Sequence, residues 1–453
     1  MSLPTSGDLN AVILAAGLGT RLKSALPKVL HPLAGRPLVT YPVAAATAVT
    51  GRPPVLVVGH GSAAVRAALG SLAVYVEQAE QLGTGHATQQ AAAALRAAGG
   101  LVLVTYGDMP LLQAATLQAL VETQRANPGP FTLLSVVAPH LRDFGRIVRD
   151  AAGELVAVVE AHQATPAEYA LTEVNVGAYC FRADWLWAHL PQLPLSPKGE
   201  YYLTDLVGLA VAAGERVAVV PTTDLAETIG INNRVQLAEA ETALRRRINE
   251  GWMLAGVTLL DPATTYIEPG VTLGPDTVIL PNTHLQGATT VGANCVLGPN
   301  TIVRDTTIGD HCHIEASVLE GAVLAEEVGV GPFAHLRKGA RLERGVHMGN
   351  FGEVKNSTLG PGVKMGHFSY IGDADIAEDV NIGAGTITCN FDGVKKNPTV
   401  IGAGAFIGSD TLLVAPVTIG AGARTGAGAV VTKNVPPDTL AVGLPARAIR
   451  KLK

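Results

Sequence analysis

The sequence predicts two folds in one chain: an N-terminal α/β domain of the Rossmann-like type and a C-terminal left-handed parallel β-helix of hexapeptide repeats. In the first half, continuous apolar runs alternate with alanine-rich amphipathic stretches, a pattern typical of a mostly parallel sheet covered on both faces. From about Leu254 onward, apolar residues recur at every sixth position. The stretch 236–253 between them is charged and has a helical pattern. We therefore expect an α/β domain at 1–232, a helical linker at 233–253 and a β-helix at 254–453.

The α/β domain should be built from short buried strands with helices between them. Strands are expected at 11–15, 55–58, 101–105 and 131–137, and helices near 39–49, 63–69, 87–98 and 114–125. Sheets of this kind bind ligands beyond the carboxyl ends of their strands. The loops 17–21 and 106–110 follow two of these strand ends, so we expect both loops at a binding site.

The C-terminal repeat has a period of six residues, which fits neither a heptad nor an α-helix and marks a hexapeptide β-helix. Each hexapeptide supplies one short strand and one tight corner, three of them close a coil, and the coils stack at about 4.8 Å. A series of β-hairpins would instead need turn signals at variable spacing. The register breaks at 383–399, where we expect a loop ejected from the coil, a common place for chemistry in solenoids. The periodic positions are Ile267, Leu273, Ile279, Leu285, Val291, Leu297, Val303, Val330, Leu336, Leu342, Met348, Val354, Met365, Ile371, Ile401, Ile407, Leu413, Ile419, Thr425 and Val431.

Composition and charge exclude several classes of protein. Of the 453 residues, 48% are hydrophobic and 16% are charged, so the chain is not of the disordered class. The net charge of −5 gives no electrostatic reason to expect a nucleic-acid partner. The four cysteines lie far apart without CxxC spacing, which disfavours a disulfide scaffold or a zinc site. The apolar run 11–16 is too short for a signal peptide or a membrane span, and we expect a soluble cytoplasmic protein without a membrane partner.

The loop after the first expected strand has the composition of a phosphate site. It reads Leu14-Ala-Ala-Gly-Leu-Gly-Thr-Arg21, and Lys28 follows shortly after it. The Gly-x-Gly pattern alone is a weak signal, because a tight strand-to-helix turn would look the same. Backbone amides of such a loop can nevertheless cradle phosphates, and the two cations would neutralise a triphosphate.

Asp108 closes another expected strand and is a candidate ligand for Mg²⁺, which prefers oxygen atoms from carboxylates, phosphates and water. The alternative role is an N-cap for the helix that follows. Between Gln78 and Thr84 the chain offers amide and hydroxyl groups that suit the edge of a nucleobase, without fixing which base. These residues together fit attack by a sugar phosphate on the α-phosphorus of a nucleoside triphosphate, with release of pyrophosphate. Such chemistry needs positioning and charge neutralisation rather than a protein nucleophile.

The β-helix carries polar side chains that an element serving only for trimerisation would not need. If this domain transfers an acyl group to an amine, the reaction needs a base that accepts the proton of the attacking amine, and a histidine suits that role near neutral pH. Cys389 is the rival, as a covalent nucleophile, but the sequence places no base or cation next to it. The polar residues are Arg337, Glu353, Lys355, His367, Tyr370, Asn381 and Asn390.

The sequence His311-Cys312-His313 looks like part of a metal site. Alternation along a strand places the intervening Cys312 on the opposite face. We therefore expect these histidines to be structural or solvated.

The motifs LAAGLGTR, PKVL, QAEQLGTGHA, YGD, FGRI, GEYYLTD and INNR resemble those of the bacterial bifunctional N-acetylglucosamine-1-phosphate uridyltransferase/glucosamine-1-phosphate N-acetyltransferase family. The resemblance covers nearly the whole chain in order. It implies a nucleotidyltransferase domain that uses UTP and N-acetylglucosamine-1-phosphate, with Mg²⁺ held by Asp108 and Asn232. The residues implied to bind the UDP-sugar are Leu14, Ala15, Ala16, Gly17, Arg21, Lys28, Gln78, Gly83, Thr84, Tyr106, Gly107, Asp108, Gly145, Glu160, Asn175 and Asn232.

The resemblance continues through VGPFAHLRKGA, GNFGEVKNS, GHFSYIGDA and VNIGAGTITCNFDG in the β-helix. It implies acetyl transfer from acetyl-CoA to glucosamine-1-phosphate with His367 as the general base, in a homotrimer whose acetyl sites lie between subunits. The residues implied to hold the sugar phosphate are Arg337, Lys355, Tyr370 and Asn381. Those implied to line the acetyl-CoA site are Ala384, Asn390, Phe391, Ser409 and Ala427.

Four positions depart from the family pattern. Phe144 and Phe391 replace tyrosines, Val176 replaces a threonine, and Leu444 replaces an arginine that contacts CoA. The sequence leaves open whether Arg447, Arg450 or Lys451 substitutes for it. Two other functions also stay open: a nucleotidyltransferase whose β-helix only trimerises, and a nucleotide-sugar-binding scaffold without turnover. Whether the acetylated intermediate passes directly between the sites is open as well.

Overall fold

The computed structural model describes residues 9–97, 99–138 and 144–451. It divides into two compact units, Met1–Leu244 and Arg245–Lys453, which we call the N-terminal and the C-terminal unit. The domain limits expected above, 1–232, 233–253 and 254–453, stay a prediction. In the described part of the chain, no helix combines the length and the apolar character needed to cross a membrane.

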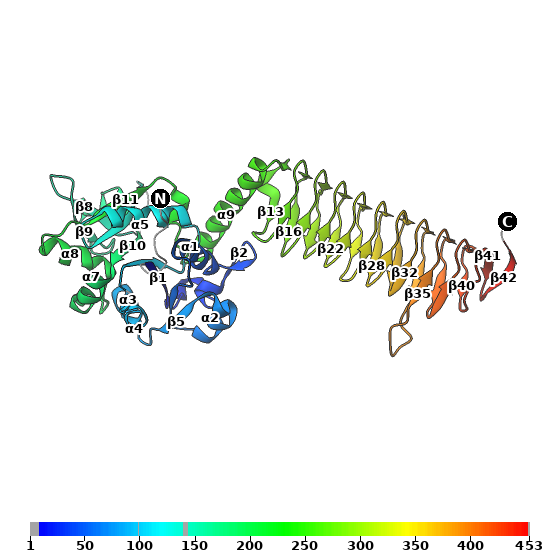
Figure 1. Cartoon of the computed structure of the whole chain (residues 1–453), viewed down its shortest axis with the longest axis horizontal. Coiled ribbons are helices and arrows are strands. Elements are labelled where there is room, and N and C mark those ends of the chain that lie inside the picture. Colours follow the sequence, from blue (N-terminus) through cyan, green and yellow to red (C-terminus); the bar gives the residue numbers. More distant parts are fainter. Residues whose placement is uncertain (1–8, 98, 139–143, 452–453) are drawn as a thin grey trace. The chain divides into compact units, whose positions relative to one another are not determined.

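The N-terminal unit is built on a mostly parallel sheet (Figure 1). Strand β10 runs antiparallel to both of its neighbours, β6 and β7, and the other pairings along the main path are parallel. The hairpin β8 (Arg146–Arg149) and β9 (Leu155–Val159) extends the sheet beside β10. The order along the path is β11 (Ala218–Thr222), β7 (Phe131–Val137), β10 (Glu173–Arg182), β6 (Leu101–Tyr106), β1 (Leu9–Ala15), β4 (Val55–Val58) and β5 (Val74–Glu77).

Helices cover both faces of this sheet. Val12 and Leu14 of β1 belong to a buried cluster formed with α3 (Thr84–Gln90), α7 (Ala183–His189) and α8 (Leu206–Ala212). Because side chains alternate along a strand, Ile13 points to the opposite face, where α1 (Thr40–Thr50) and α5 (Ala114–Ala126) pack against β1 and β7. The expected helix 87–98 is two helices, α3 and α4 (Ala92–Leu95), and its last position lies outside the described residues. Helix α2 is Ser62–Leu69.

Helix α9 (Arg234–Leu254) occupies the charged stretch in which we expected a helix. Its second half closes the first coil of the C-terminal unit. The side chain of Asn249 donates from Nδ2 to the carbonyl oxygens of Pro262 (2.9 Å) and Thr265 (3.0 Å). Ile248 and Trp252 pack against the β-helix core. A solenoid needs such a cap, because its terminal coil would otherwise expose its interior.

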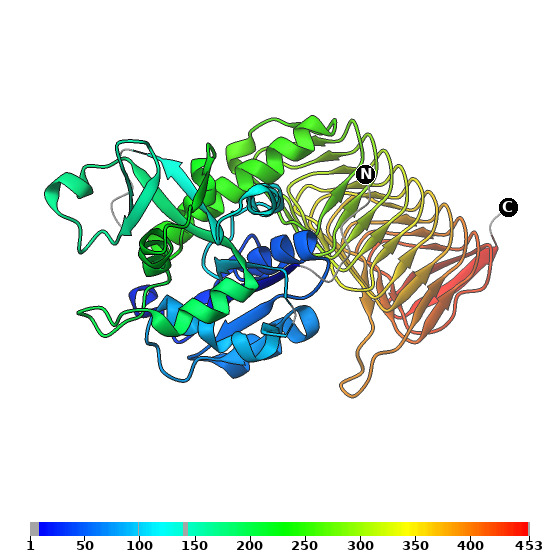
Figure 2. The same cartoon turned by 60° about the vertical axis from the view of Figure 1, so that its left-hand side comes forward.

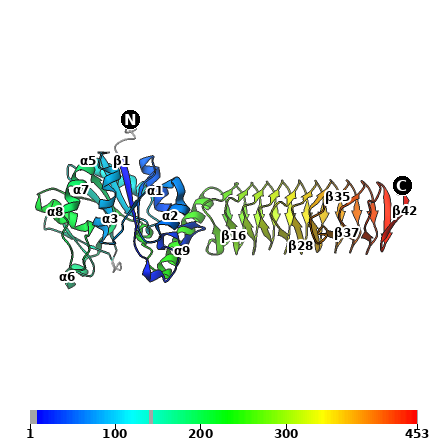
Figure 3. The same cartoon turned by 90° about the horizontal axis from the view of Figure 1, so that it is seen from below.

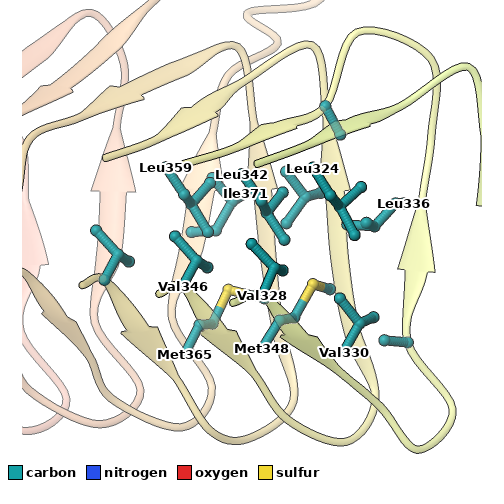
Figure 4. Packing of buried hydrophobic residues seen from close by; sticks show 14 of the residues in the cluster. Leu324, Val328, Val330, Leu336, Leu342, Val346, Met348, Leu359, Met365 and Ile371 are labelled. Atoms are coloured by element: carbon teal, nitrogen blue, oxygen red, sulfur yellow. The ribbon is translucent and has the colours of Figure 1, made fainter. Parts of the chain in front are cut away.

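The C-terminal unit is a left-handed β-helix with three parallel sheets along its sides, and its coils stack in a single row (Figure 3). Its strands run from β12 (Thr258–Leu259) to the antiparallel end strand β42 (Ala446–Lys451), and in all but the last coils each strand pairs with the third strand after it. The residues of the six-residue period point inward. Figure 4 shows Leu336, Leu342, Met348 and Ile371 meeting in this interior, where each is at most 1% exposed.

Single-residue deletions at two of the three corners explain why the six-residue register lapses between Val303 and Val330. From Val303 the next inward residue is Ile308, only five positions on, and the corner between them turns at Asp305, whose φ is +48°. Asn356 (φ +45°) and Asp373 (φ +51°) turn the same corner in later coils. Asparagine and aspartate are the non-glycine residues that best tolerate this left-handed conformation.

The ejected loop is shorter than the break at 383–399 predicts. Strand β34 (Ile387–Cys389) stays in the coil, with Ile387 paired to Tyr370 and to Leu412. Thr388 takes the inward position at 1% exposure and its hydroxyl accepts from the amide of Gly372 at 2.7 Å. A hydrogen-bonded hydroxyl therefore replaces the apolar residue at this inward position, so the six-residue period of apolar residues is interrupted in the sequence although the coil continues. The loop is 390–398, ahead of β35 (Thr399–Ile401), and it projects from the stack in Figures 1 and 2.

Candidate active sites

Two adjoining pockets, of about 560 and 570 Å³, open in the N-terminal unit where the parallel strands end. They share five lining residues, which are Thr84, Tyr106, Asp108, Tyr202 and Asn232. The carboxyl ends of β1 and β6 supply the floor, since Leu14 and Tyr106 line the first pocket. This is the edge at which sheets of this class bind ligands.

The structure places nearly all of the expected UDP-sugar residues in the lining of these two pockets. Gly107 lies behind them: its amide donates to the carbonyl of Leu14 at 2.8 Å, and a Cβ added at Gly107 would lie 3.0 Å from that of Ala15. It therefore holds the ends of β6 and β1 together. The first pocket is lined by Leu14, Ala15, Ala16, Gly17, Arg21, Lys28, Gln78, Gly83, Thr84, Tyr106, Asp108 and Asn232, and the second adds Gly145, Glu160 and Asn175.

Lys28, Asp108 and Asn232 meet at one point, although they lie far apart in the sequence. The ammonium of Lys28 donates to Asn232 Oδ1 at 2.7 Å and forms an ion pair with Asp108. The amide of Ile231 donates to the carbonyl of Asp108 at 2.9 Å, which holds Asn232 beside it. Gly19 allows this approach, because a Cβ there would lie 2.6 Å from that of Lys28 and its φ is +64°.

The two oxygen ligands at this point fit a magnesium ion. The carboxylate of Asp108 and the amide oxygen of Asn232 already converge on one cation, the Lys28 ammonium. Mg²⁺ takes one or two such protein oxygens and completes its shell with phosphate oxygens and water. Within 9–97, 99–138 and 144–451 there is no group of three His, Cys, Asp or Glu side chains that could hold a metal without a substrate.

The second pocket is lined by a tightly packed polar wall. Asn175 donates from Nδ2 to the hydroxyl of Tyr179 at 2.7 Å, and Glu160 accepts from the Thr204 hydroxyl at 2.9 Å. Burial, then the carboxylates of Glu160 and Asp108, raise the pKa of Tyr106 above its usual range. Its phenol therefore stays protonated and can donate a hydrogen bond to a ligand.

Gln78 is held at the base of the first pocket and is only 3% exposed. Its Nε2 is 3.1 Å from the carbonyl oxygen of Gly83 and 3.0 Å from Nδ1 of His86, so the amide oxygen is the group that it can present to a ligand. Gly83 has a φ of +97°, and a Cβ there would lie 2.6 Å from the carbonyl oxygen of Tyr201. Thr84 accepts from the amide of Leu203 at 2.9 Å.

Tyr202 and Gly177 are among the pocket residues that the expected set lacks. Tyr202 lines both pockets and is 8% exposed. Gly177, with a φ of +92°, lies against Tyr106, and a Cβ there would be 2.4 Å from the ring. Tyr202 belongs to GEYYLTD, one of the motifs that carry the family resemblance, and Gly177 lies two residues after Asn175 in β10. No chemical pattern in the sequence singles them out.

In the C-terminal unit, His367 starts a column of equivalent corner positions in successive coils. Backbone hydrogen bonds join these corners: Gly385 donates to Phe368 (2.7 Å), Asp410 to Ala384 (2.6 Å) and Gly428 to Ser409 (2.8 Å). His367 is exposed, and the coils after it place small side chains at its position. The four stacked residues are His367, Ala384, Ser409 and Ala427.

The sheet on one side of this corner carries most of the expected sugar-phosphate residues. Glu353 of β28 (Gly352–Lys355) is paired with Tyr370 of β31 (Ser369–Gly372) and accepts from Arg337 Nη1 at 2.8 Å. Lys355 lies beside Gly372 in the same register. Asn390, at the start of the ejected loop, donates to Asp373 at 2.6 Å and lies 3.5 Å from the hydroxyl of Tyr370.

Asn381 lies on the other side of the corner. It belongs to β33 (Asn381–Ile382), in a different sheet from Arg337, Lys355 and Tyr370, and it pairs with Lys364. Phe391 is 56% exposed on the ejected loop, with the ammonium of Lys396 5.1 Å from its ring centroid. In one chain the expected acetyl-transfer residues therefore face two directions, with His367 between them.

The other candidate residues are placed as follows. All four cysteines are free, and burial raises the pKa of the Cys389 thiol, which disfavours a thiolate nucleophile. Cys312 is buried, whereas His311 and His313 are exposed, in agreement with the expected alternation. Leu444 is 78% exposed.

Comparisons with known proteins agree across the chain. The family model of the MobA-like NTP transferase domain matches residues 11–176, and the model of the bacterial transferase hexapeptide (six repeats) matches 270–305 and 398–433. The chain is 47% identical over 440 residues to the "Bifunctional protein GlmU" of Pelobacter propionicus, covering 96% of this chain and 95% of that protein. It is 49% identical over 436 residues to that of Trichlorobacter lovleyi, covering 95% of each. The corresponding protein of Shouchella clausii is 42% identical over 433 residues, again with 95% of each chain covered.

Proposed function

The chain belongs to the family of bifunctional GlmU proteins, and from that premise we propose which of its residues perform the two reactions. It is a bifunctional transferase of UDP-N-acetylglucosamine synthesis. Its C-terminal unit transfers the acetyl group of acetyl-CoA to glucosamine-1-phosphate. Its N-terminal unit then transfers the uridylyl group of UTP to N-acetylglucosamine-1-phosphate and releases pyrophosphate. The product supplies the amino sugar of the cell wall.

The meeting of Lys28, Asp108 and Asn232 in one pocket is the observation that best supports uridylyl transfer there. A phosphate oxygen of the sugar attacks the α-phosphorus, and the bond to the pyrophosphate oxygen breaks. Lys28 and Arg21 neutralise the phosphates, while Tyr106, Glu160 and Asn175 orient the sugar in the adjoining pocket. Mg²⁺, held by Asp108 and Asn232, would stabilise the negative charge that the reaction moves.

His367 is the proposed general base of acetyl transfer. The amine of the sugar attacks the thioester carbonyl, the imidazole accepts the proton that the amine loses, and the thiolate of CoA leaves and is protonated. We propose that a thin acyl carrier lies along the small side chains of Ala384, Ser409 and Ala427. We assign Arg337, Lys355, Tyr370 and Asn381 to the sugar phosphate, and Asn390 and Phe391 to the acetyl-CoA side.

A homotrimer with shared acetyl sites accounts for the way these residues face two directions. Arg337 and Lys355 on one sheet and Asn381 on another would meet only if a second copy supplied one of the two faces. Sedimentation velocity of the full chain at micromolar concentration should give a trimer, and a stable monomer with full acetyl transfer would contradict shared sites. Free cysteines suit the reducing cytoplasm, where we place the protein.

One experiment tests both activities and the two alternatives. The protein is incubated with glucosamine-1-phosphate, acetyl-CoA, UTP and Mg²⁺, and the products are identified by mass spectrometry. We expect UDP-N-acetylglucosamine, and omission of UTP should leave N-acetylglucosamine-1-phosphate. Uridylyl transfer without acetyl transfer would support the alternative in which the β-helix only trimerises. If neither product forms, the chain would be a binding scaffold without turnover. Parallel reactions with CTP and TTP measure the base choice.

A further inference from the structure

The ammonium of Lys28 lies where a metal ion would lie. It donates to Asn232 Oδ1 at 2.7 Å and forms an ion pair with Asp108, the two side chains to which we assign Mg²⁺. The site is partly enclosed, since the side chains of Lys28 and Asp108 are 12% and 24% exposed. One group of the chain therefore satisfies both proposed ligands at once.

Lys28 and a magnesium ion cannot share this position. Mg²⁺ requires its oxygen ligands at about 2.0–2.1 Å in a near-octahedral shell, and an ammonium in contact with the same carboxylate would repel it. The metal can therefore bind only when the ammonium moves away. The backbone need not move with it, because the amide of Leu30 donates to Pro27 (2.9 Å) and that of Val39 to Val29 (3.1 Å), which fixes the turn around Lys28. The flexible stem of the lysine can swing on this fixed base.

The pocket itself offers a destination for the displaced ammonium. Lys28 and Arg21 line the same pocket as the loop from Leu14 to Gly19, where the phosphates of the nucleotide are proposed to bind. A phosphate oxygen can replace the carboxylate as the partner of the ammonium. A metal ion that arrives without nucleotide offers no such replacement partner.

We propose that Lys28 is an exchangeable occupant of the metal position, which rests on the proposed site at Asp108 and Asn232. In the nucleotide-free protein it neutralises Asp108 and keeps the two oxygen ligands converged. When Mg²⁺ and nucleotide bind together, the ion takes this place and the ammonium moves to a phosphate. Lys28 thus opposes binding of the bare metal ion and favours the joint binding of metal and nucleotide.

Binding of Mn²⁺, a spectroscopic substitute for Mg²⁺, tests this in the nucleotide-free full-length protein. Free Mn²⁺ is followed by electron paramagnetic resonance during titration, so the readout does not depend on activity. Lys28→Met keeps an unbranched side chain that is one atom shorter and removes its charge. It should tighten Mn²⁺ binding by about tenfold, which corresponds to about 1.4 kcal/mol. Arg21→Met is the matched control, because it removes one positive charge from the same pocket at an exposed side chain, and it should change the affinity by less than about twofold, as expected for a screened surface charge.

The double variant Lys28→Met/Asp108→Asn separates the role of Lys28 from the location of the metal. The double variant should bind Mn²⁺ more weakly than Lys28→Met does. If Lys28→Met does not tighten binding while Asp108→Asn weakens it, the exchange proposal is overturned and the metal site stands. If the double variant binds as tightly as Lys28→Met, the ion lies elsewhere and both proposals fail. Equal tightening by Arg21→Met would reduce the effect to general electrostatics and would also overturn the exchange. Circular dichroism checks folding, and Lys28→Gln replaces Lys28→Met if the methionine variant does not fold.

Discussion

The two sites of this chain are built in opposite ways. In the N-terminal unit, residues from distant loops converge on a pocket at one sheet edge, and Lys28, Asp108 and Asn232 touch one another. In the C-terminal unit, one corner is repeated in successive coils, and the expected acetyl-transfer residues lie along it and on the two sheets that flank it. Convergence gives a site that one chain can complete. Repetition gives a line of similar positions along one edge of the solenoid, and we propose that a second copy of the chain supplies the residues that face it.

Removing the carboxylate of Asp108 should separate the two sites most sharply. Asp108→Ala should lower uridylyl transfer by about 10⁴-fold, or roughly 5.5 kcal/mol, because the phosphates lose their metal anchor. Acetyl transfer should be unaffected. Pyrophosphate release and CoA release are measured separately on the same preparation. A uridylyl rate within about tenfold of the parent would remove Asp108 from the metal site.

His367→Ala makes the complementary separation. It should lower acetyl transfer by about 10²–10⁴-fold, the usual contribution of a positioned general base. The pH–rate profile of the parent should contain a limb of imidazole type, because the base must be neutral to act. That limb should vanish in the variant and leave only deprotonation of the amine.

The variant should still transfer uridylyl groups to supplied N-acetylglucosamine-1-phosphate at the parent rate. An unchanged acetylation profile would assign the base role to Glu353 or to solvent.

A smaller effect is expected where the converged site depends on close packing. Gly177→Ala places a Cβ 2.4 Å from the ring of Tyr106 at a φ of +92°. The ring must move, so uridylyl transfer should fall by about 10-fold to 100-fold, as for a misplaced positioning group. Melting temperature and KM for the sugar phosphate are the measurements.

Gly153→Ala is the matched control, because Gly153 has a φ of +83° with no atom within 4 Å of an added Cβ. It should show only the backbone strain, about 1–3 kcal/mol, without loss of activity. Equal activity losses in both variants would show that the collision with Tyr106 does not matter.

The smallest expected effect is on the pH dependence of stability. Burial first, then the nearby Arg234 charge, lower the pKa of His31 in the folded protein. Below about pH 6.5 the unfolded chain therefore binds more protons at this group than the folded chain, and the free energy of unfolding falls as the pH decreases. In His31→Asn, the urea midpoint of the N-terminal unit should depend less on pH between 7.5 and 5.5.

His284, whose pKa burial also lowers, provides the counterpart in the C-terminal unit. His284→Asn should flatten the pH dependence of that unit and leave the N-terminal transition as it is. If His284→Asn instead changed the pH dependence of the N-terminal transition, the unfolding transitions of the two units would be coupled.

The sequence predicts the elements whose chemistry is periodic or continuous. Strands β4 and β7 have the expected bounds, and the apolar positions of the six-residue period lie in or against the β-helix core. Strand β10 escaped prediction because Asn175 and Gly177 look like a turn, whereas both are buried in a bulged strand, with Asn175 satisfied by Tyr179. Strand β5 was not predicted, although its residues Val-Tyr-Val-Glu favour a strand; it is a short edge strand with no buried residue.

Local motifs predict most of the residues that we expect at the two sites, but they do not predict how these residues contact one another. Nothing near Lys28 in the sequence indicates that its ammonium reaches Asp108 and Asn232. The three residues lie in separate loops, after β1, after β6 and before α9, and only the fold brings these loops together. Nor does the sequence show that Asn381 and Lys355 lie on different sheets. Some corners between successive strands are one residue shorter than others, so a strict six-residue count assigns residues to the wrong sheet.

The short reach of pairing in the β-helix also has a kinetic consequence. Thr265 pairs with Thr283, 18 positions later (283 − 265), whereas in the N-terminal unit Leu9 pairs with Leu101, 92 positions later (101 − 9). Parallel sheets fold slowly when distant segments must find one another, and fast when contacts are local. A coil that has formed is a template for the next one, so the β-helix can grow one coil at a time. In the N-terminal unit β4 and β5 also pair over a short distance, with Val55 beside Val74, but β1 cannot pair with β6 until the residues as far as Leu101 are in place.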